Sequence, residues 1–384
     1  MSAEAPVRYI PENIVTETTK VLPILPLTPV PEWEEPVSDY QAGKWGFPEG
    51  RIYTVVGIGE DECVTNTTGP FRAKVNGKEY PSPLIIGRLD KKDTEGTGVL
   101  CFLAYNREER TLTRLSEVEP IEYSEDPAVT PIGGRLGLTS VSISPHPEDP
   151  KKIKWQPVLR TNHDEDEITQ LQEVLRGLEW SKDFRLCQLS DGRIAVTDRP
   201  EREIPLSDGR VIKAKVVTLL IVNSLEEITQ EKLEGARVVK GMTGEKGFWY
   251  GVGSMIELEN GRLGGVAHKA RMVGKNKEYD VVTGELDLEK GEWLNERVVA
   301  RAQHVPVGKV KRIFDPVQQV YDEEILLRVL FGNDQRFSLD LSKMYIFGGR
   351  SDAEPIEIVT GYPYSSLPKR TSTFNDFYLL RDNQ

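Results

Sequence analysis

The chain has 384 residues and a formal net charge of −12, with 49 Lys and Arg against 61 Asp and Glu. An acidic chain without a basic stripe is a poor binder of nucleic acid, and no apolar run reaches the roughly 18 residues of a membrane span. The 3 cysteines form no CxxC pair, and the 4 histidines show no HxxxH spacing. We therefore expect a cytoplasmic protein without metal, cofactor, nucleic acid or membrane, and its start shows no secretory signal.

Residues 1–50 differ from the rest of the chain in their prolines, which recur every few residues from Pro23 to Pro36. Proline excludes both a regular helix and a central strand. Apolar residues between the prolines, such as Ile24 and Leu27, indicate that this segment is partly docked. We predict an extended N-terminal arm over residues 1–50 and one catalytic domain over residues 51–384.

From about residue 51 onward, short runs rich in Val, Ile, Leu, Phe and Tyr alternate with turn residues. The strongest turn signals are Gly133-Gly134-Arg135, Asp191-Gly192-Arg193, Asp208-Gly209-Arg210 and Asn260-Gly261-Arg262. Such turns predict β-hairpins, because type I′ turns need positive φ at both central residues. Gly134, Gly192 and Gly261 are 58 and 69 residues apart, near the length of a four-stranded propeller blade with long loops.

This pattern predicts an all-β fold, a five-bladed β-propeller, because radial repetition of about five such blades covers the strand edges. Two packed β-domains are the alternative. A few short surface helices are expected at Ile168–Leu178, Leu225–Glu234 and Glu323–Leu330.

Four segments place charged residues within apolar strand sequence, where a charge needs a partner or a task. They are Ile86–Glu95, Tyr123–Gly134, Lys182–Leu189 and Gly264–Arg271. Each also has a structural interpretation: a solvated turn at Asp93 and Glu95, a turn or Asx arrangement at Asp126 before Pro127, an ion pair of Asp183 with Arg185, and a structural His268. The residues by themselves indicate carboxylates and cations around one β-funnel, which is compatible with sugar and phosphate chemistry.

Six blocks, in this order, resemble those of the former domain of unknown function 1861. They are Asn66–Phe71, Gly87–Glu95, Glu125–Gly134, Lys182–Pro200, Lys311–Asp315 and Gly349–Glu354. The resemblance covers about residues 51–365. It implies a five-bladed propeller similar to the β-mannoside phosphorylases of glycoside hydrolase family 130. The activity implied is inverting β-mannosyl transfer or phosphorolysis.

The resemblance also implies roles for single residues. Asp126 would be the acid/base, which protonates the leaving sugar oxygen in phosphorolysis and deprotonates the acceptor hydroxyl in synthesis. Phosphate would be the nucleophile, so no second catalytic carboxylate is required. Sugar hydroxyls would be bound by Asn66, Arg88, Asp93, Asp183 and Asp352, and phosphate or a sugar nucleotide by Arg185, His268, Lys311 and Arg312.

The chain departs from the family pattern at Cys63, Thr65, Gly251–Ser254 and Ala267. These departures affect the expected sugar specificity and leave Asp126 in place. Two alternatives stay open: a propeller glycoside hydrolase, with a second carboxylate about 6.5–9.5 Å from Asp126, and a non-catalytic carbohydrate-binding propeller. The expected partners are a mannose-containing oligosaccharide and either inorganic phosphate or a sugar nucleotide, and the oligomeric state stays open.

Overall fold

The computed structural model describes residues 49–91, 98–146, 153–162, 167–205, 209–243, 247–273, 276–301, 329–330, 343–350, 354–361, 363–366 and 369. The chain divides into two compact units, Met1–Phe47 and Pro48–Gln384, and the described residues all belong to the second unit. Most of the expected N-terminal arm therefore lies outside the described residues. No helix in the described part is long and apolar enough to cross a membrane.

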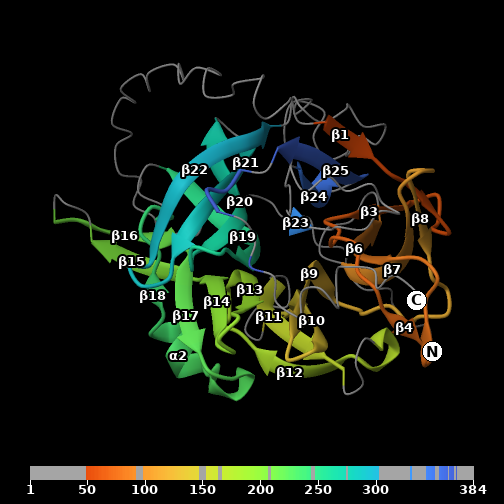
Figure 1. The fold of residues 1–384 in the computed structure, drawn as a ribbon, viewed down its shortest axis with the longest axis horizontal. Helices are drawn as coiled ribbons and strands as arrows, with labels where there is room; N and C mark the ends of the chain where they lie inside the picture. The colour runs from red at the N-terminus through yellow and green to blue at the C-terminus, as the bar shows by residue number, and fades with distance from the viewer. Residues whose placement is uncertain are drawn as a thin grey trace, which may run out of the picture. The chain divides into compact units, whose positions relative to one another are not determined.

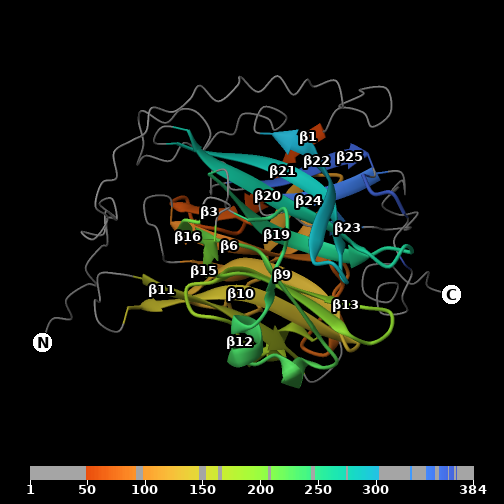
Figure 2. The same ribbon diagram turned by 90° about the vertical axis from the view of Figure 1, so that its left-hand side faces the viewer.

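Five sheets of four or five strands follow one another along the second unit and form a five-bladed β-propeller, as predicted (Figures 1 and 2). From the central axis outward, the first blade contains β3 (Glu62–Thr65), β6 (Leu84–Lys91), β7 (Val99–Asn106), β8 (Thr111–Arg114) and β2 (Thr54–Val56). The second blade contains β9 (Ser124–Ile132), β10 (Arg135–Pro145), β11 (Ile153–Thr161) and β12 (Gln172–Arg176). The third contains β13 (Lys182–Gln188), β14 (Ile194–Arg199), β17 (Thr218–Val222) and β18 (Arg237–Val238).

The fourth blade contains β19 (Phe248–Glu257), β20 (Leu263–Val273), β21 (Asn276–Asp287) and β22 (Glu292–Arg301). The fifth contains β23 (Val329–Leu330), β24 (Lys343–Arg350), β25 (Glu354–Gly361) and β1 (Glu49–Ile52). Two small hairpins stand outside the blades: β4 (Lys74–Val75) with β5 (Lys78–Glu79), and β15 (Glu201–Pro205) with β16 (Val211–Lys215).

The first strand of the described chain closes the ring, because β1 pairs with β25 as the outer strand of the last blade. A buried cluster joins this blade to the first one. The Glu357 carboxylate of β25 accepts hydrogen bonds from the Tyr53 hydroxyl at 2.6 Å and the Tyr105 hydroxyl at 2.9 Å. Arg107 donates to the same carboxylate at 3.1 Å. The seam is therefore held by both backbone pairing and a buried polar network.

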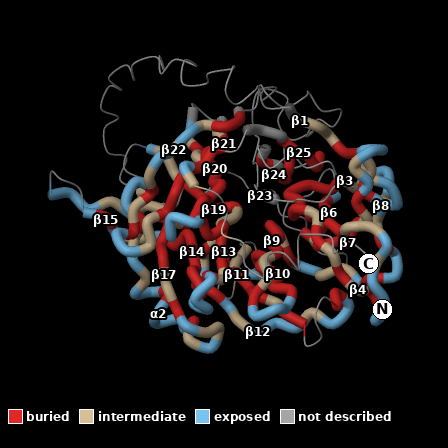
Figure 3. The backbone as a smooth tube through the Cα atoms, in the orientation of Figure 1, coloured by how far each residue is buried: buried red, intermediate tan, exposed pale blue. Residues whose placement is uncertain are grey.

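Apolar side chains fill the space between neighbouring blades in five clusters, one for each pair of blades. Alternation along a strand supplies two clusters at once: in β6, Leu84 and Ile86 pack toward the second blade, whereas Ile85 packs toward the fifth. Burial is therefore highest in the blade strands and lowest in the turns (Figure 3). This two-sided burial explains the nearly continuous apolar runs in the sequence.

The hairpins predicted at the glycine turns are confirmed, although only Gly133-Gly134 has the positive φ at both central residues that a type I′ turn needs; at Asp191-Gly192 and Asn260-Gly261 the glycine alone has it. Gly134, Gly192 and Gly261 have φ values of 76°, 92° and 79° and close the first hairpins of the second, third and fourth blades. Their spacing is therefore the blade repeat. Gly209 also has a positive φ between β15 and β16, in the small hairpin outside the third blade.

The helix predictions were less accurate. Ile168–Gln170 is one 3-10 turn and the following residues form β12, because the outer edge of the second blade offers a hydrogen-bonding partner in β11. The second predicted helix is two short pieces, a 3-10 turn at Leu225–Glu227 and α2 at Gln230–Glu234, and Thr229 supplies the side-chain cap of α2. Of the third, the described residues Val329–Leu330 form β23.

Candidate active site

Bulges interrupt the inner strands of the second, third and fourth blades. The register shifts opposite Thr139–Val141 in β9, at Lys182–Arg185 in β13 and at Val252–Ser254 in β19. A bulge re-aims a side chain that strict alternation would bury between two blades. The inner strands are thus adapted to present polar groups toward the centre of the propeller.

Three of the residues predicted to contact substrate have left-handed backbones. The φ values of Asn66, Asp126 and Asp183 are 48°, 51° and 57°. Asp126 and Asp183 lie in the bulges of β9 and β13, and Asn66 directly follows β3. Asn and Asp tolerate this region best, but it still costs free energy and is concentrated at functional sites.

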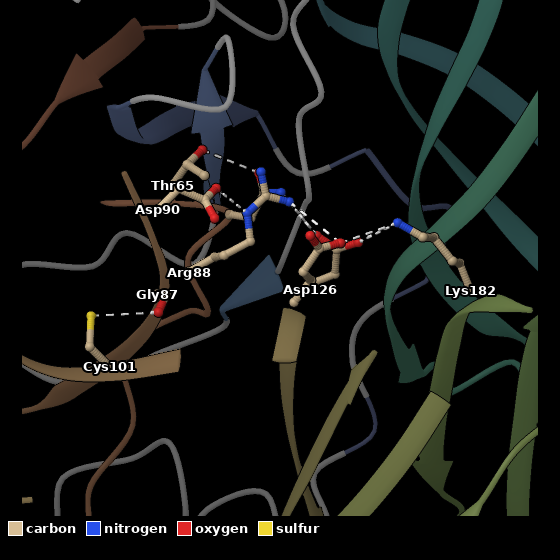
Figure 4. Close-up of polar contacts among 9 residues, drawn as sticks. Thr65, Gly87, Arg88, Asp90, Cys101, Asp126 and Lys182 are labelled. Carbon is tan, nitrogen blue, oxygen red and sulfur yellow. Dashed lines mark hydrogen bonds and ion pairs between the residues drawn. The ribbon is translucent and has the colours of Figure 1, made fainter. Parts of the chain in front are cut away.

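The carboxylate of Asp126 is 2% exposed and is surrounded by three donors, which come from the first and third blades. Figure 4 shows two of them, Arg88 and Lys182, on either side of the carboxylate. Asn66 Nδ2 donates to Oδ1 at 3.0 Å, and Arg88 Nη1 lies 3.4 Å from the same oxygen. Lys182 Nζ lies 3.5 Å from Oδ2, on the opposite side. Because Asp126 lies within β9, its interpretation as a turn or Asx arrangement before Pro127 is wrong.

Burial by itself would raise the pKa of Asp126, but Lys182, Arg88 and the hydrogen bond from Asn66 together outweigh burial and lower this pKa to about 2. The group is therefore a carboxylate at neutral pH. Its cationic neighbours are shared with the adjacent Glu125, whose Oε2 lies 3.5 Å from Lys182 Nζ and 3.9 Å from Arg88 Nη1.

Arg88 is fixed on its other side by Asp90, whose Oδ2 accepts a 2.7 Å hydrogen bond from Arg88 Nε (Figure 4). Lys182 was not among the predicted site residues. Lys182 directly precedes Asp183 in the sequence, at the start of β13. It contacts Asp126 because the third blade packs beside the second, and no local pattern in the sequence shows this contact.

Asp183 pairs with Arg199 and not with Arg185, so the expected ion pair is corrected: Arg199 Nε lies 2.6 Å from Asp183 Oδ2. Alternation would place Asp183 and Arg185 on one face, but the bulge between them breaks it. Arg185 instead donates to the carbonyl oxygens of Gly253 and Phe184, each at 3.1 Å. It thereby ties the third blade to the fourth.

His268 and Asp183 converge over Gly251 of the fourth blade. A Cβ at Gly251 would lie 2.6 Å from His268 Nε2 and would overlap the Asp183 carboxylate. His268 Nε2 is buried and has no hydrogen-bond partner among the described residues. Burial lowers the pKa of His268 to about 4 despite the nearby Asp183 carboxylate, so the imidazole is neutral at pH 7.

A further buried carboxyl group, that of Asp198, lies on β14. It accepts hydrogen bonds from the Ser181 hydroxyl and, at 2.9 Å, from the Arg199 amide. Burial raises the pKa of Asp198 to about 7. Asp198 was not predicted as a site residue, although it is a charged residue within an apolar strand, the same signal as at Asp126.

The structure brings six of the predicted residues to the two innermost strands of the first four blades or, for Asn66, directly after β3: Asn66, Arg88, Asp126, Asp183, Arg185 and His268. The remaining predicted site residues, Asp93, Asp352, Lys311 and Arg312, lie outside the described residues. Within the described ranges there is no group of three His, Cys, Asp or Glu side chains that could hold a metal ion.

Comparison with known proteins gives one family and several structures. The family model described as "Protein of unknown function (DUF1861)" matches residues 44–366. MPT-1, a GDP-Man-dependent mannosyltransferase from Leishmania mexicana, is 16% identical with a TM-score of 0.65, over 84% of this chain and 92% of that chain. MPT-4, a mannose phosphorylase from Leishmania mexicana in complex with a phosphate ion, is 17% identical with a TM-score of 0.64, over 87% and 96%. No curated protein matches the chain. At these identities the likeness to the solved structures establishes the fold.

Proposed function

Because the chain belongs to the DUF1861 family, we propose that it is an inverting mannosyl-transferring enzyme in which Asp126 moves the proton. The observation that carries the proposal is the environment of Asp126: a buried carboxylate, on a strained bulge, held ionised by Arg88 and Lys182. Ionisable groups whose pKa is shifted both by burial and by specific charged neighbours are typical of active sites. The mannosyltransferase and phosphorylase activities of MPT-1 and MPT-4, which share the fold, support the sugar.

In the synthetic direction, the acceptor hydroxyl attacks the anomeric carbon of the donor sugar and gives its proton to Asp126. The bond from the sugar to the donor phosphate breaks, and the phosphate oxygen keeps the electron pair. A carboxylate with a pKa of about 2 is a weak base. The incoming anionic phosphate offsets the positive charge of Arg185, which contributes to the low pKa of Asp126, and this raises the pKa as the reaction requires.

In phosphorolysis the same groups act in reverse. A phosphate oxygen attacks the anomeric carbon, and the leaving sugar oxygen takes the proton from Asp126, directly or through a sugar hydroxyl. Arg185 and Arg199 supply positive charge for the phosphate, and neutral His268 offers a ring nitrogen for a hydrogen bond. Asn66 and Asp183 bind sugar hydroxyls. The proposal also includes the roles predicted from the sequence for four other residues. Asp93 and Asp352 bind sugar hydroxyls, and Lys311 and Arg312 bind phosphate.

A glycoside hydrolase is the second candidate, and the position of Glu125 favours it. Its carboxylate shares the Lys182 ammonium with Asp126, so a second acidic group lies near the first. In an inverting hydrolase such a group activates water.

Product analysis tests these candidates. The protein is incubated with β-1,2-mannobiose, with and without inorganic phosphate, and separately with GDP-mannose and mannose. We expect α-mannose 1-phosphate that depends on phosphate, or mannobiose formed from GDP-mannose. Free mannose that forms without phosphate would indicate the hydrolase, and binding of mannobiose without any turnover would contradict both enzymes.

A further inference from the structure

An aromatic side chain lies beside the Asp126 centre and has no role in the proposed reaction. Trp155 is on β11, where it pairs with Ile143 of β10. The Ile143 amide donates to the Tyr123 carbonyl at 2.8 Å, so Trp155 is level with the segment that enters the bulge of β9. Its neighbour Trp180, two residues before the inner strand of the third blade, packs edge-on against it with the ring centroids 4.9 Å apart.

Two ammonium groups lie over the ring of Trp155, one from the third blade and one from the small β15–β16 hairpin. Lys182 Nζ is 5.9 Å from its centroid, and Lys215 Nζ is 5.4 Å from it. Lys182 is also the group that lies 3.5 Å from Asp126 Oδ2. Lys215 comes from the end of β16, opposite Glu201, in the small hairpin inserted between β14 and β17. This hairpin therefore brings a second ammonium group to the edge of the site.

The surroundings of Lys215 are unfavourable for a cation. Burial and the positive charges of Arg199 and Lys182 outweigh Asp183 and Glu201 and together lower the pKa of Lys215 to about 8. Cations gathered in this way bind an anion that offsets their mutual repulsion. Trp155 Nε1 is a buried donor without a hydrogen-bond partner among the described residues. A ligand that offers an acceptor oxygen would satisfy this donor.

We propose that Lys215, Lys182 and Trp155 form a second anion subsite, which holds the distal phosphate of a nucleoside diphosphate sugar. This rests on the proposed function. The phosphate attached to the sugar lies at Arg185 and His268, where a single inorganic phosphate also fits. A donor with two linked phosphates needs a second cationic position, and the hairpin supplies it. The structure thus favours a sugar nucleotide as the donor over inorganic phosphate as the nucleophile.

In the transfer step, the acceptor oxygen forms a bond to the anomeric carbon while the bond from that carbon to the diphosphate breaks. The diphosphate leaves with the electron pair, and its added negative charge is distributed over both cationic positions. The acceptor proton passes to Asp126 and then to solvent. Lys215 therefore stabilises the leaving group and does not take part in proton transfer.

Calorimetric titration with GDP and with inorganic phosphate tests the subsite in the wild type, Lys215→Met and Lys213→Met. Lys213 lies on the same strand but is exposed, so it is the matched control. We expect Lys215→Met to weaken GDP binding about tenfold or more, the loss typical of one charged hydrogen bond. Phosphate binding should stay unchanged in both variants. In the wild type, GDP affinity should fall as the pH rises from 7 to 9, because Lys215 loses its proton, and Lys215→Met should abolish this fall.

Other outcomes overturn the subsite. Equal weakening of GDP and phosphate would place Lys215 in the first phosphate position. A lower melting temperature with unchanged GDP binding would make it a clamp between two blades, and a wild type that does not bind GDP would also contradict it. The proposed function fails separately: GDP binding that depends on Lys215, without transfer or phosphorolysis, would keep the subsite and refute the reaction.

Discussion

At the scale of the residue, Asp126 illustrates why a buried charge needs several partners. Its carboxylate lies in the centre of an all-β body, where an unpaired charge would be expelled or protonated. Asn66, Arg88 and Lys182 come from three different inner segments, so no single strand determines the protonation state of Asp126. The proton affinity of Asp126 therefore depends on the assembled propeller.

Lys182→Met tests this electrostatic account. Loss of the ammonium removes the largest stabilising charge beside the carboxylate, so the pKa of Asp126 rises from about 2 toward or above its ordinary value of 3.8. We expect the acid limb of the pH profile of kcat/KM in synthesis to move upward by about one pH unit or more, because this limb follows the protonation of the base in the free enzyme. Lys182→Arg should keep the limb in place, and an identical limb in Lys182→Met would contradict the account.

The residue types of the site could be predicted from sequence, whereas most contacts could not. A carboxylate in an apolar strand is costly, and this reasoning selected Asp126 and Asp183. Their partners lie on other strands or beyond a bulge, as Arg199 does for Asp183. A single residue inserted in a strand reverses the alternation, and nothing in the local sequence marks that insertion.

At the scale of the element, the bulges and the glycines opposite them shape the site together. Asp183 on β13 points toward β19. Because β19 has a glycine at this position, Gly251, there is room for the side chains of both Asp183 and His268. The segment Gly251–Ser254, which departs from the family pattern, thus begins directly against Asp183 and His268. The blade repeat could be predicted from the hairpin glycines, because positive φ restricts the residue type, but the strand β12 could not, because its partner β11 decided its conformation.

Gly251→Ala tests the packing of β19 against β13. The added methyl group would overlap Asp183 and His268, so one of the two side chains must move. We expect a loss of about tenfold or more in kcat/KM with a native circular dichroism spectrum, because small displacements at an active site are costly. Gly235→Ala, whose Cβ would lie 3.4 Å from its nearest neighbour, is the control. Full activity in Gly251→Ala would show that the close approach is not required.

At the scale of the whole molecule, the ring is closed by residues far apart in sequence. β1 pairs with β25, and Glu357 connects the last blade to Tyr53 before β2 and to Tyr105 on β7 of the first blade. The number of blades, five, could be predicted from the length of the chain and the spacing of the hairpin glycines. The closure could not be predicted, because neither Glu357 nor Tyr53 has a local pattern that distinguishes it from an ordinary strand residue.

Glu357→Ala tests the closure. It leaves Arg107 and two tyrosine hydroxyls without their shared acceptor in a buried seam. We expect the free energy of unfolding to fall by about 3 kcal/mol or more in urea titrations, the range typical for removing one partner of a buried ion pair. The exposed Glu203→Ala on β15 should change it by no more than about 0.5 kcal/mol. Equal stability of the two variants would contradict the role given to this network.

The claim that Asp126 moves the proton is tested most directly by turnover and sugar binding in the Asp126→Asn variant. The control is Glu122→Gln, because Glu122 is an exposed acidic residue four positions earlier. The amide keeps the size of the side chain but cannot accept the acceptor proton. We expect Asp126→Asn to lose at least about a hundredfold in kcat with mannobiose and phosphate or with GDP-mannose, while mannobiose still binds, and Glu122→Gln to behave as the wild type. Turnover in Asp126→Asn equal to that of the wild type would remove this carboxylate from the reaction.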